Sequence, residues 1–481
     1  MFRCITKRAR QAQQRRIEGK TAMAHLGLVG VGVMGSALAQ NLAEKGHKVS
    51  LYDRDLERAA KAAEAAEALL APGDVKAFVA SLPRPRAILV LVPSGKPLDA
   101  VIDTLSLLLE PGDLIADLGN SFYQETEARV TACEARGLVY LGMGISGGAE
   151  GARHGPAIMA GGSQTAWARV RQPLQDAAAS YQGDPCCDWY GPGGAGHFIK
   201  MMHNGIEYAD MQMIAEAYGI LRDGAGLKAA AIGDVFAGWM DGPLNSYLVE
   251  IAAEVCRTKD PATGSAMLDI ILDTAGQKGT GRWSVIEALH LGAPVSTMAA
   301  AVEARNVSAQ KPARQAMEQT WGPPKITPLA VDAAALGQAL LAAKIIAYDQ
   351  GFGVLRRASE TFDWALDLGA IARGWRAGCI IRSVLLDEIS EAFDKGSPDL
   401  MSAPAMRPHL NGHVALRRTV GDALGHGLQA PALFAALAAF DGARTGLGTA
   451  NMIQGLRDRF GAHGFERTDA PGKKVNGPWH S

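Results

Sequence analysis

Short apolar runs alternate with helical stretches over residues 25–180, and this alternation constrains the fold more than any other feature of the chain. The runs cover residues 26–29, 49–52, 87–92, 114–117 and 138–141, and the helical stretches between them cover residues 37–45, 56–71, 98–109 and 125–136. Strands and helices that alternate in this way form βαβ units, whose strands pair in parallel. The pattern therefore predicts a parallel sheet covered by helices.

The second half of the chain has no further strand-like runs. From residue 196 onward, apolar residues recur at helical spacing in stretches 198–223, 246–256, 336–361 and 371–393, which predicts an almost entirely helical region. The motif at residues 218–222 is echoed at residues 352–356, and the echo favours duplication of a helical unit. The periodicity ends near residue 456, so we expect a C-terminal tail.

Composition excludes several classes of protein. The chain has 481 residues, enough for two or three domains, and a formal net charge of −1, which gives no general attraction to nucleic acid or to an anionic membrane. No apolar run reaches the roughly 18 residues of a membrane span. The six cysteines form no Cys-x-x-Cys pair, which indicates reduced thiols in a cytoplasmic protein. Residues 1–24 are basic and have no apolar signal core, so we expect a disordered extension, with a targeting arm as the alternative.

A glycine-rich stretch follows the first predicted strand and opens the first predicted helix. It consists of Gly30, Val31, Gly32, Val33, Met34 and Gly35. The first glycine permits a tight turn, the second lets a pyrophosphate approach the backbone, and the third lets helix and strand pack closely. The helix N-terminus faces the phosphates. In this context the stretch predicts a Rossmann domain that binds a dinucleotide.

Asp53 ends the second predicted strand, where the adenosine ribose of a dinucleotide would lie. A carboxylate there suits the 2′-hydroxyl of NAD and opposes the 2′-phosphate of NADP, and Asp55 adds a second negative charge. Two like charges about 4 Å apart repel by roughly 1–4 kcal/mol at surface-like dielectrics. Arg54 and Arg58 offset part of this repulsion. We therefore expect NAD to be favoured, with use of both cofactors as the alternative.

Five polar side chains after residue 194 share one face of a predicted helix. Lys200, His203, Asn204, Glu207 and Tyr208 stand at positions i, i+3, i+4, i+7 and i+8. A stripe with a base, an acid and several hydrogen-bonding groups fits acid–base catalysis. Spacing alone leaves a solvated amphipathic face as the alternative, but the glycines at positions 194 and 196 favour a site because they let other backbone approach closely.

This stretch resembles the signature of 6-phosphogluconate dehydrogenases, and the similarity extends over residues 24–463. Further matching blocks lie at residues 117–121, 144–153, 186–189, 276–281, 374–383 and 457–463, with Arg305 among them. The resemblance implies oxidative decarboxylation of 6-phosphogluconate to ribulose 5-phosphate and CO₂ with reduction of NAD or NADP, a step of the pentose phosphate pathway. The family usually has asparagine, arginine and threonine at positions 53–55, so the two acids here again favour NAD.

The resemblance also implies residue roles. Lys200 is expected to be the base that takes the proton of the C3 hydroxyl, and Glu207 the acid that protonates the enediol left after CO₂ departs. The implied substrate-binding residues are Asn120, Ser146, Gly147, Gly148, His203, Asn204, Tyr208, Lys278, Thr280 and Arg305. Besides residues 30–35, the cofactor-binding candidates are Asp53, Arg54, Asp55, Val92, Pro93, Ser94 and Asn120. No metal is expected, because cations and hydrogen-bond donors can stabilise the enediolate.

In the family, an arginine and a histidine of the tail enter the active site of the other subunit. The resemblance therefore implies a homodimer in which Arg457 and His463 complete the neighbouring site. We expect a basic extension (1–24), a Rossmann domain (25–196), an all-helical substrate and dimerisation domain (197–455), and a tail that reaches the partner subunit (456–481).

Three alternative functions differ in what they require. A β-hydroxyacid dehydrogenase acting on a small unphosphorylated acid has no use for the cations Lys278, Arg305 and Arg457. A non-catalytic dinucleotide-binding protein has no use for Lys200 and Glu207. A nucleic-acid-binding role rests only on the basic residues 1–24 and predicts salt-sensitive binding through them.

Overall fold

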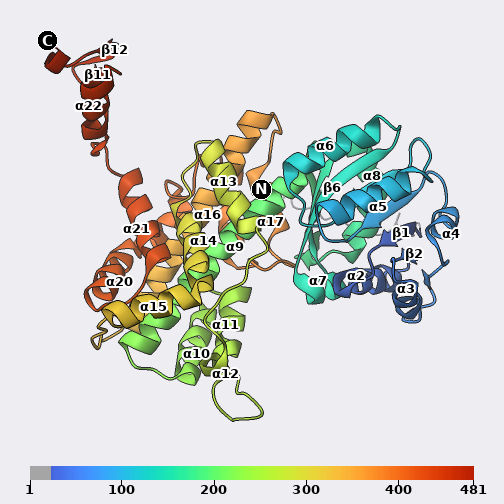
Figure 1. The fold of residues 1–481 in the computed structure, drawn as a ribbon, viewed down its shortest axis with the longest axis horizontal. Coiled ribbons are helices and arrows are strands. Elements are labelled where there is room, and N and C mark those ends of the chain that lie inside the picture. Colours follow the sequence, from blue (N-terminus) through green and yellow to red (C-terminus); the bar gives the residue numbers. More distant parts are fainter. Residues whose placement is uncertain (1–22, 481) are drawn as a thin grey trace, which may run out of the picture.

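The computed structural model describes residues 23–480, so the predicted basic extension lies outside the described residues except for its last two positions. The described chain forms a sheet-containing half, a helical half, and a C-terminal segment that stands clear of both (Figure 1). This arrangement confirms the predicted order of an α/β dinucleotide-binding half followed by a large helical half.

The first half is built on one sheet with strand order β10-β7-β6-β5-β4-β1-β2-β3. The strands are β1 (His25–Val29), β2 (Lys48–Tyr52), β3 (Leu69–Leu70), β4 (Ala87–Val90), β5 (Leu114–Asp117), β6 (Val139–Ser146), β7 (Ala157–Gly162) and β10 (Cys187–Gly191). Strands β1 to β6 pair in parallel in the order 3-2-1-4-5-6, which is typical of dinucleotide-binding sheets. Strand β7 is not among the predicted strands, and it runs antiparallel to β6.

Helices cover both faces of the sheet because strand side chains are apolar on both sides. Leu28 and Leu89 belong to the core on one face, and their neighbours Val29 and Val90 belong to the core on the other. The helices are α2 (Val33–Glu44), α3 (Leu56–Ala63), α4 (Val75–Ala80), α5 (Lys96–Ser106), α6 (Tyr123–Glu134), α7 (Gly148–His154) and α8 (Gln164–Ala177). Helices α2 and α8 pack on the first face, and α4 and α5 pack on the second.

The helix predicted over residues 56–71 is too long. Helix α3 ends at Ala63, and Leu69 and Leu70 form the edge strand β3 on β2. The alanines and glutamates of this segment suit a helix, but Leu69 gains burial by pairing with Val49 at the sheet edge. Packing on the sheet therefore overrides the local helix preference.

The second half is helical up to the C-terminal segment. Its helices are α9 (Ala195–Gly219), α10 (Ala229–Gly238), α11 (Tyr247–Arg257), α12 (Met267–Ile270), α13 (Thr280–His290), α14 (Ser296–Ala309), α15 (Lys311–Trp321), α16 (Ala333–Phe362), α17 (Leu368–Gly374), α18 (Leu385–Asp394), α19 (Arg407–Leu410), α20 (His413–Gly425) and α21 (Pro431–Ala443). Helix α9 continues as a π-helical turn over Ile220–Gly224. Helices α9 and α16 run through the middle of the shared core.

The long helix predicted over residues 371–393 is broken. Helix α17 ends at Gly374 and α18 begins at Leu385, with an irregular loop between them. Gly378 adopts φ +69°, a left-handed conformation that interrupts a helix, and its carbonyl accepts a hydrogen bond from Ala157 N at 2.8 Å. The loop is thus fixed against strand β7, beside the catalytic candidates on α9.

The echo between α9 and α16 is reflected in equivalent contacts. Glu216 and Gln350 each stand two residues before the matched aromatic. Glu216 accepts hydrogen bonds from the first two backbone N–H groups of α21, and Gln350 accepts one from Thr297 N at the start of α14. Asp210 and Lys344, each eight residues before the matched aromatic, pair with one another at 3.0 Å. These contacts support the predicted duplication.

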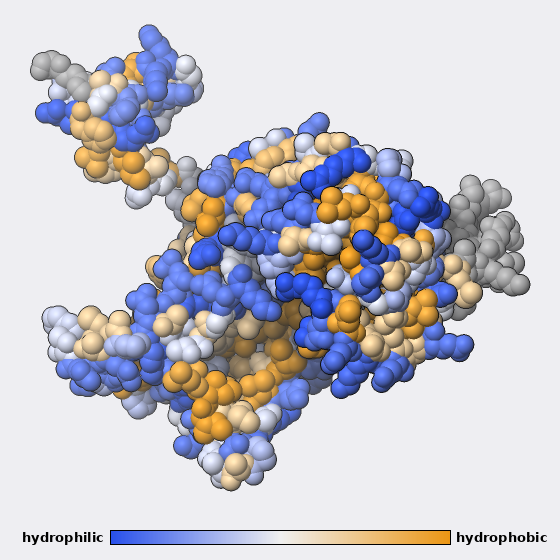
Figure 2. All heavy atoms as spheres, turned by 45° about the vertical axis from the view of Figure 1, so that its right-hand side comes forward, coloured by the Kyte–Doolittle hydropathy of each residue, from blue (hydrophilic) through white to orange (hydrophobic). Residues whose placement is uncertain are grey.

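The C-terminal segment is more ordered than predicted. It contains α22 (Ala450–Gly461) and an antiparallel hairpin of β11 (Phe465–Arg467) and β12 (Ala470–Val475). The segment folds around Asp458, whose carboxylate accepts hydrogen bonds from Gly464 N at 2.8 Å and from Trp479 Nε1 at 2.9 Å. The predictions of no helical periodicity after residue 456 and of no strands after residue 196 are therefore wrong. Figure 2 shows the segment separated from the body by a narrow neck.

Candidate active site

The glycine-rich turn lies at the rim of a cavity of about 450 Å³. Gly30 adopts φ +94° to make the turn, and a side chain on Gly35 would collide with the Gly30 carbonyl. A Cβ on Gly32, by contrast, would meet nothing within 4 Å. The turn therefore leaves the N-terminus of α2 open to a pyrophosphate, and these residues fit a dinucleotide.

Asp53 supports this turn as well as lining the cavity. Its Oδ2 accepts a hydrogen bond from Val31 N at 2.8 Å, and its Oδ1 accepts one from Asp55 N at 3.0 Å. Arg58 lies 3.6 Å from Asp53 Oδ1, and Arg54 is an exposed lining residue. Val92 and Pro93 also line the cavity. Asp55 is not a lining residue, because its carboxylate caps α3 and pairs with Arg58 at 3.2 Å.

Helix α9 reaches the sheet through glycines. A side chain on Gly144 of β6 would collide with the Lys200 side chain, and one on Gly196 would collide with the Gly142 carbonyl. The close approach places Lys200 against the ends of strands β6 and β7, at the junction of the two halves. Sequence reasoning identified the glycine near the start of α9 but not its counterparts on β6.

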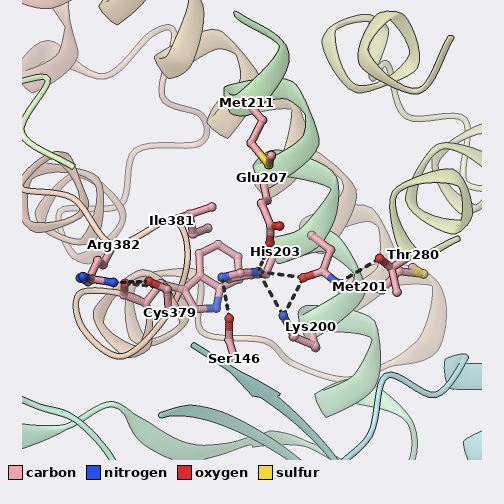
Figure 3. A network of polar contacts seen from close by, with 12 residues as sticks. Ser146, Lys200, Met201, His203, Glu207, Met211, Thr280, Cys379, Ile381 and Arg382 are labelled. Carbon is pink, nitrogen blue, oxygen red and sulfur yellow. Dashed lines mark hydrogen bonds and ion pairs between the residues drawn. The ribbon is translucent and has the colours of Figure 1, made fainter. Parts of the chain in front are cut away.

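The predicted helix face forms a connected polar network (Figure 3). Lys200 Nζ donates a hydrogen bond to Asn204 Oδ1 at 2.6 Å and lies 3.5 Å from His203 Nδ1. His203 Nε2 lies 3.3 Å from Ser146 Oγ, and Asn204 Nδ2 donates to Thr280 Oγ1 at 3.0 Å. Strand β6, helix α9 and the start of α13 thereby meet at one point.

Burial shifts the pKa of all three titratable groups of this network. Desolvation lowers the pKa of Lys200, against the opposing charge of Glu207. Desolvation also holds the pKa of His203 well below its usual value, with the charge of Lys200 acting in the same direction. Glu207, whose Oε2 lies 3.8 Å from His203 Nδ1, has its pKa raised by desolvation. The surroundings therefore favour a neutral base and a protonated acid two helical turns apart.

Three of the predicted phosphate-binding residues come from different helices, with Tyr208 next to Glu207 on α9, Thr280 at the start of α13, and Arg305 on α14. Tyr208 is buried, and the guanidinium carbon of Arg305 sits 3.5 Å from the centroid of its ring. Arg305 Nη1 donates to Gly276 O at 3.4 Å. Gly279, at φ +94°, precedes Thr280 at the N-terminus of α13, while Lys278 is exposed beside it. The arrangement gathers two cations and a helix N-terminus, which suits an anion.

Arg457 and His463 are not brought to this site within one chain. Both belong to the C-terminal segment, which Figure 1 shows extending away from the body. Arg457 makes only a local hydrogen bond among those described, from Nη1 to Gln454 Oε1 at 3.2 Å. Asn120 is exposed at the carboxyl end of β5, and Gly147 and Gly148 begin α7 directly after Ser146.

The structure adds residues that the sequence did not single out. Trp375, fully buried in the loop after α17, contacts the His203 ring edge-on at 5.6 Å between centroids. Cys379, in the same loop, is buried near Lys200, and burial raises the pKa of its thiol to about 12. Only the matching of residues 374–383 to the family indicated that this loop approaches the site.

Within residues 23–480, no group of three or more His, Cys, Asp or Glu side chains is placed to hold a metal ion. None of the helices in this part of the chain has the length and apolarity needed to cross a membrane.

A dinucleotide-binding sheet joined to a helical domain, with a buried lysine and an acid on the joining helix, defines a dinucleotide-dependent dehydrogenase. The family comparison specifies the class further. Residues 25–191 match the NAD binding domain of 6-phosphogluconate dehydrogenase, and residues 196–479 match the C-terminal domain of the same enzyme. The chain belongs to the 6-phosphogluconate dehydrogenase family.

Individual relatives agree over nearly the full length. The chain is 45% identical over 458 residues to the decarboxylating 6-phosphogluconate dehydrogenase of Chlamydia pneumoniae, covering 93% of this chain and 95% of that one. It is 43% identical over 456 residues to the NAD(+)-dependent enzyme of Bacillus subtilis, covering 93% and 97%. The Plasmodium falciparum enzyme, solved in its apo form, with its cofactor NADP+ and with its substrate 6-phosphogluconate, superposes with a TM-score of 0.91 at 37% identity, covering 95% and 100%. These matches favour the 6-phosphogluconate dehydrogenase hypothesis over the alternative functions.

Proposed function

We propose that this chain oxidises and decarboxylates 6-phosphogluconate to ribulose 5-phosphate and CO₂, with reduction of a nicotinamide dinucleotide. The observation that carries the proposal is the buried Lys200, hydrogen-bonded to Asn204 at 2.6 Å, with Glu207 two turns further along α9. Kinship with named 6-phosphogluconate dehydrogenases supports the same substrate.

The network suits two proton transfers on neighbouring carbons. When bound, the nicotinamide supplies the hydride acceptor. Neutral Lys200 takes the proton of the C3 hydroxyl as hydride leaves C3, which gives a β-keto acid. Loss of CO₂ leaves an enediol when Lys200 returns its proton to the C3 oxygen. Glu207 then donates a proton to the carbon that carried the carboxylate while Lys200 takes back the hydroxyl proton, which gives the ketone. Asn120, His203 and Asn204 orient the hydroxyl groups, and the donors around them stabilise the enediolate.

We also propose which residues bind the carboxylate and phosphate ends of the substrate. We assign the carboxylate end to Ser146 and the backbone of Gly147 and Gly148, and the phosphate to Tyr208, Lys278, Thr280 and Arg305. A guanidinium and a helix N-terminus together favour a dianion. Asn120, at the end of β5, faces both cofactor and substrate in this assignment.

We infer a preference for NAD. Asp53 lines the cavity and is held in place by Val31 N, so a 2′-phosphate bound there would face a fixed carboxylate. The positive charges of Arg54 and Arg58 would instead favour the 2′-phosphate of NADP. The relatives include an NAD(+)-dependent enzyme and one solved with NADP+, so kinship leaves both cofactors open.

We infer a homodimer with shared sites, and the exposed position of the C-terminal segment supports this inference. Leu447, Met452, Ile453, Leu456 and Phe460 are exposed on the protruding segment, and Phe460 is 75% exposed. An apolar face of this kind in a single chain favours burial against another chain. We propose that the segment docks on a second copy and adds Arg457 and His463 to its phosphate site. We further propose that residues 25–196 bind the cofactor, that residues 197–455 bind substrate and dimerise, and that the enzyme works in the cytoplasm.

The test is the initial rate of dinucleotide reduction with 6-phosphogluconate, with NAD and NADP supplied in parallel. Rapid reduction supports the reaction, and a higher kcat/KM with NAD supports the role of Asp53. An enzyme inactive with 6-phosphogluconate but active on a small unphosphorylated hydroxy acid would contradict the proposal.

A further inference from the structure

A buried carboxylate lies directly beneath the loop that carries Asn120. Asp117 ends strand β5 and is 0% exposed. Its Oδ1 accepts a hydrogen bond from Gly119 N at 2.8 Å, and its Oδ2 accepts one from Ser121 Oγ at 2.5 Å. Gly119 and Ser121 are the two neighbours of Asn120, so one carboxylate binds the backbone N–H on one side of Asn120 and the Ser121 hydroxyl on the other.

The hydrogen bonds to the Asp117 carboxylate come from neutral donors. Tyr140 OH donates a third hydrogen bond to Asp117 Oδ2 at 3.1 Å, and burial raises the pKa of that phenol, which keeps it a donor. Within residues 23–480, the one ion-pair contact of Asp117 is with His197 Nε2 at 3.7 Å. Burial lowers the pKa of His197, so the imidazole is neutral near pH 7. With no lysine or arginine of residues 23–480 ion-paired to it, this buried carboxylate depends on such donors, and the two from Gly119 and Ser121 order the loop.

The other end of the loop is fixed to the substrate side. Tyr123 OH donates a hydrogen bond to buried Glu287 Oε2 at 2.8 Å, and the ring of Phe122 lies 5.3 Å from that of Trp283. Glu287 and Trp283 belong to α13, the helix that begins at Thr280. The loop is thus held between the cofactor-binding sheet and the helix whose N-terminus faces the proposed phosphate site.

We propose that Asp117 is a positioning residue that sets the orientation of Asn120 where cofactor and substrate meet. The inference rests on the proposed role of Asn120 at that junction. Through the Gly119 N–H and the Ser121 hydroxyl, Asp117 acts on both neighbours of Asn120 without touching the ligands. A displacement of about 1 Å in such a group lowers turnover by roughly 100-fold.

The test is a double-mutant cycle between Asp117→Ala and Asn120→Ala. Alone, each change is expected to lower kcat by about 10- to 100-fold. If Asp117 acts through Asn120, adding Asp117→Ala to Asn120→Ala lowers kcat by less than about threefold more, because the group it positions is already absent. Effects that multiply in the double variant would overturn the proposal, because they would show that Asp117 acts elsewhere.

Two further variants distinguish a positioning role of Asp117 from a general effect on folding stability. Asp113, at the other end of β5, is a buried carboxylate bound by Arg86 N at 2.6 Å and Arg86 Nη1 at 2.7 Å. Asp113→Ala should lower the melting temperature and leave kcat of the folded enzyme unchanged. Asp117→Asn keeps an oxygen for Gly119 N and should recover at least about tenfold of the lost turnover. An Asp113→Ala enzyme as slow as Asp117→Ala would count against positioning.

Two outcomes separate this inference from the proposed function. If wild-type protein does not turn over 6-phosphogluconate, the proposed function fails, and amide hydrogen exchange of residues 118–122 still tests the role of Asp117. Exchange at Gly119 should be at least about tenfold faster in Asp117→Ala than in Asp113→Ala. If Asp117→Ala does not fold, Ser121→Ala removes one donor and should lower kcat about threefold to tenfold with the same lack of additivity. Unchanged exchange in Asp117→Ala, or unchanged turnover in Ser121→Ala, would overturn the inference.

Discussion

Replacing Lys200 with methionine separates the chemistry of this side chain from its effect on stability. The side chain is 6% exposed, and its amino group donates to Asn204 Oδ1 at 2.6 Å. Methionine fills much of the same space and cannot take a proton. Loss of a general base lowers turnover by about 10²- to 10⁴-fold, which is roughly 3–5 kcal/mol of transition-state stabilisation. We expect a fall in kcat of that size.

The thermal stability of the Lys200→Met variant should increase or stay unchanged, although its kcat falls. Burial lowers the pKa of Lys200 below its unfolded value, so over the pH range between the two values the unfolded chain binds a proton that the folded chain does not. The free energy of unfolding of the wild type therefore rises with pH across that range, and the lysine destabilises the fold at pH 7. Lys200→Met removes this cost, and the variant should unfold at the same temperature as the wild type or higher.

Lys344 supplies the matched comparison. It is an equally buried lysine in the same core, but its Nζ lies 3.0 Å from Asp210 Oδ2. Lys344→Met leaves that carboxylate buried without its partner, which costs about 3–5 kcal/mol of folding free energy. Initial rates of dinucleotide reduction, together with thermal unfolding of both variants between pH 6 and about pH 9, distinguish the two lysines.

Either of two results would contradict a neutral, catalytic Lys200. Near-normal kcat in Lys200→Met would exclude it as the base. A loss of stability comparable to that of Lys344→Met would show that the amino group is charged and paired in the folded enzyme, so that it would not be available to take a proton.

Four further predictions concern other groups. Glu207→Gln should still reduce the dinucleotide in a single turnover but release ribulose 5-phosphate about 10²- to 10⁴-fold more slowly, which product quantification after rapid quenching would measure. Asp53→Asn should raise the ratio of kcat/KM with NADP to that with NAD, and an unchanged ratio would remove Asp53 as the determinant. Deleting residues 446–481 should abolish turnover and shift the protein to a monomer in sedimentation, while dinucleotide binding persists; an active truncated enzyme would contradict the shared site. Burial raises the pKa of Glu216 to about 7, so wild-type stability should fall as pH rises from about 4.5 to 7, by up to about 3 kcal/mol, and urea titrations should show a flatter profile for Glu216→Gln.

The fold was predictable where one local rule decides the structure. Strand and helix alternation in residues 25–146 identified the sheet, and Gly30 and Gly35 adopt the turn and the close contact that their motif predicts. The prediction was wrong where long-range packing decides. Leu69 prefers the sheet edge to its own helix, and Gly378 breaks a helix because its carbonyl binds Ala157.

The site was predictable in so far as it follows helical spacing. Lys200, His203 and Asn204 share a face and are hydrogen-bonded or adjacent to one another as expected. The spacing of apolar and polar residues within one helix cannot predict which residues contact it from other parts of the chain. Trp375 reaches His203 from a loop more than 170 positions away in the sequence, and no periodicity within α9 could indicate it.

The glycines of strand β6 explain why a single helix can unite these groups. A helix packed on a sheet through ordinary side chains would keep its backbone about 10 Å from the sheet. A lysine side chain on that helix would then have to extend across most of this distance. At Gly144 the Lys200 side chain occupies the space that a Cβ would take, so its amino group is buried at the seam between the two halves. Gly144→Ala should therefore displace Lys200 and lower kcat while leaving the cofactor cavity intact, and dinucleotide affinity measured by fluorescence should be unchanged. Loss of dinucleotide binding in this variant would show instead that the contact maintains the sheet, and that the position of Lys200 follows from something other than the glycine.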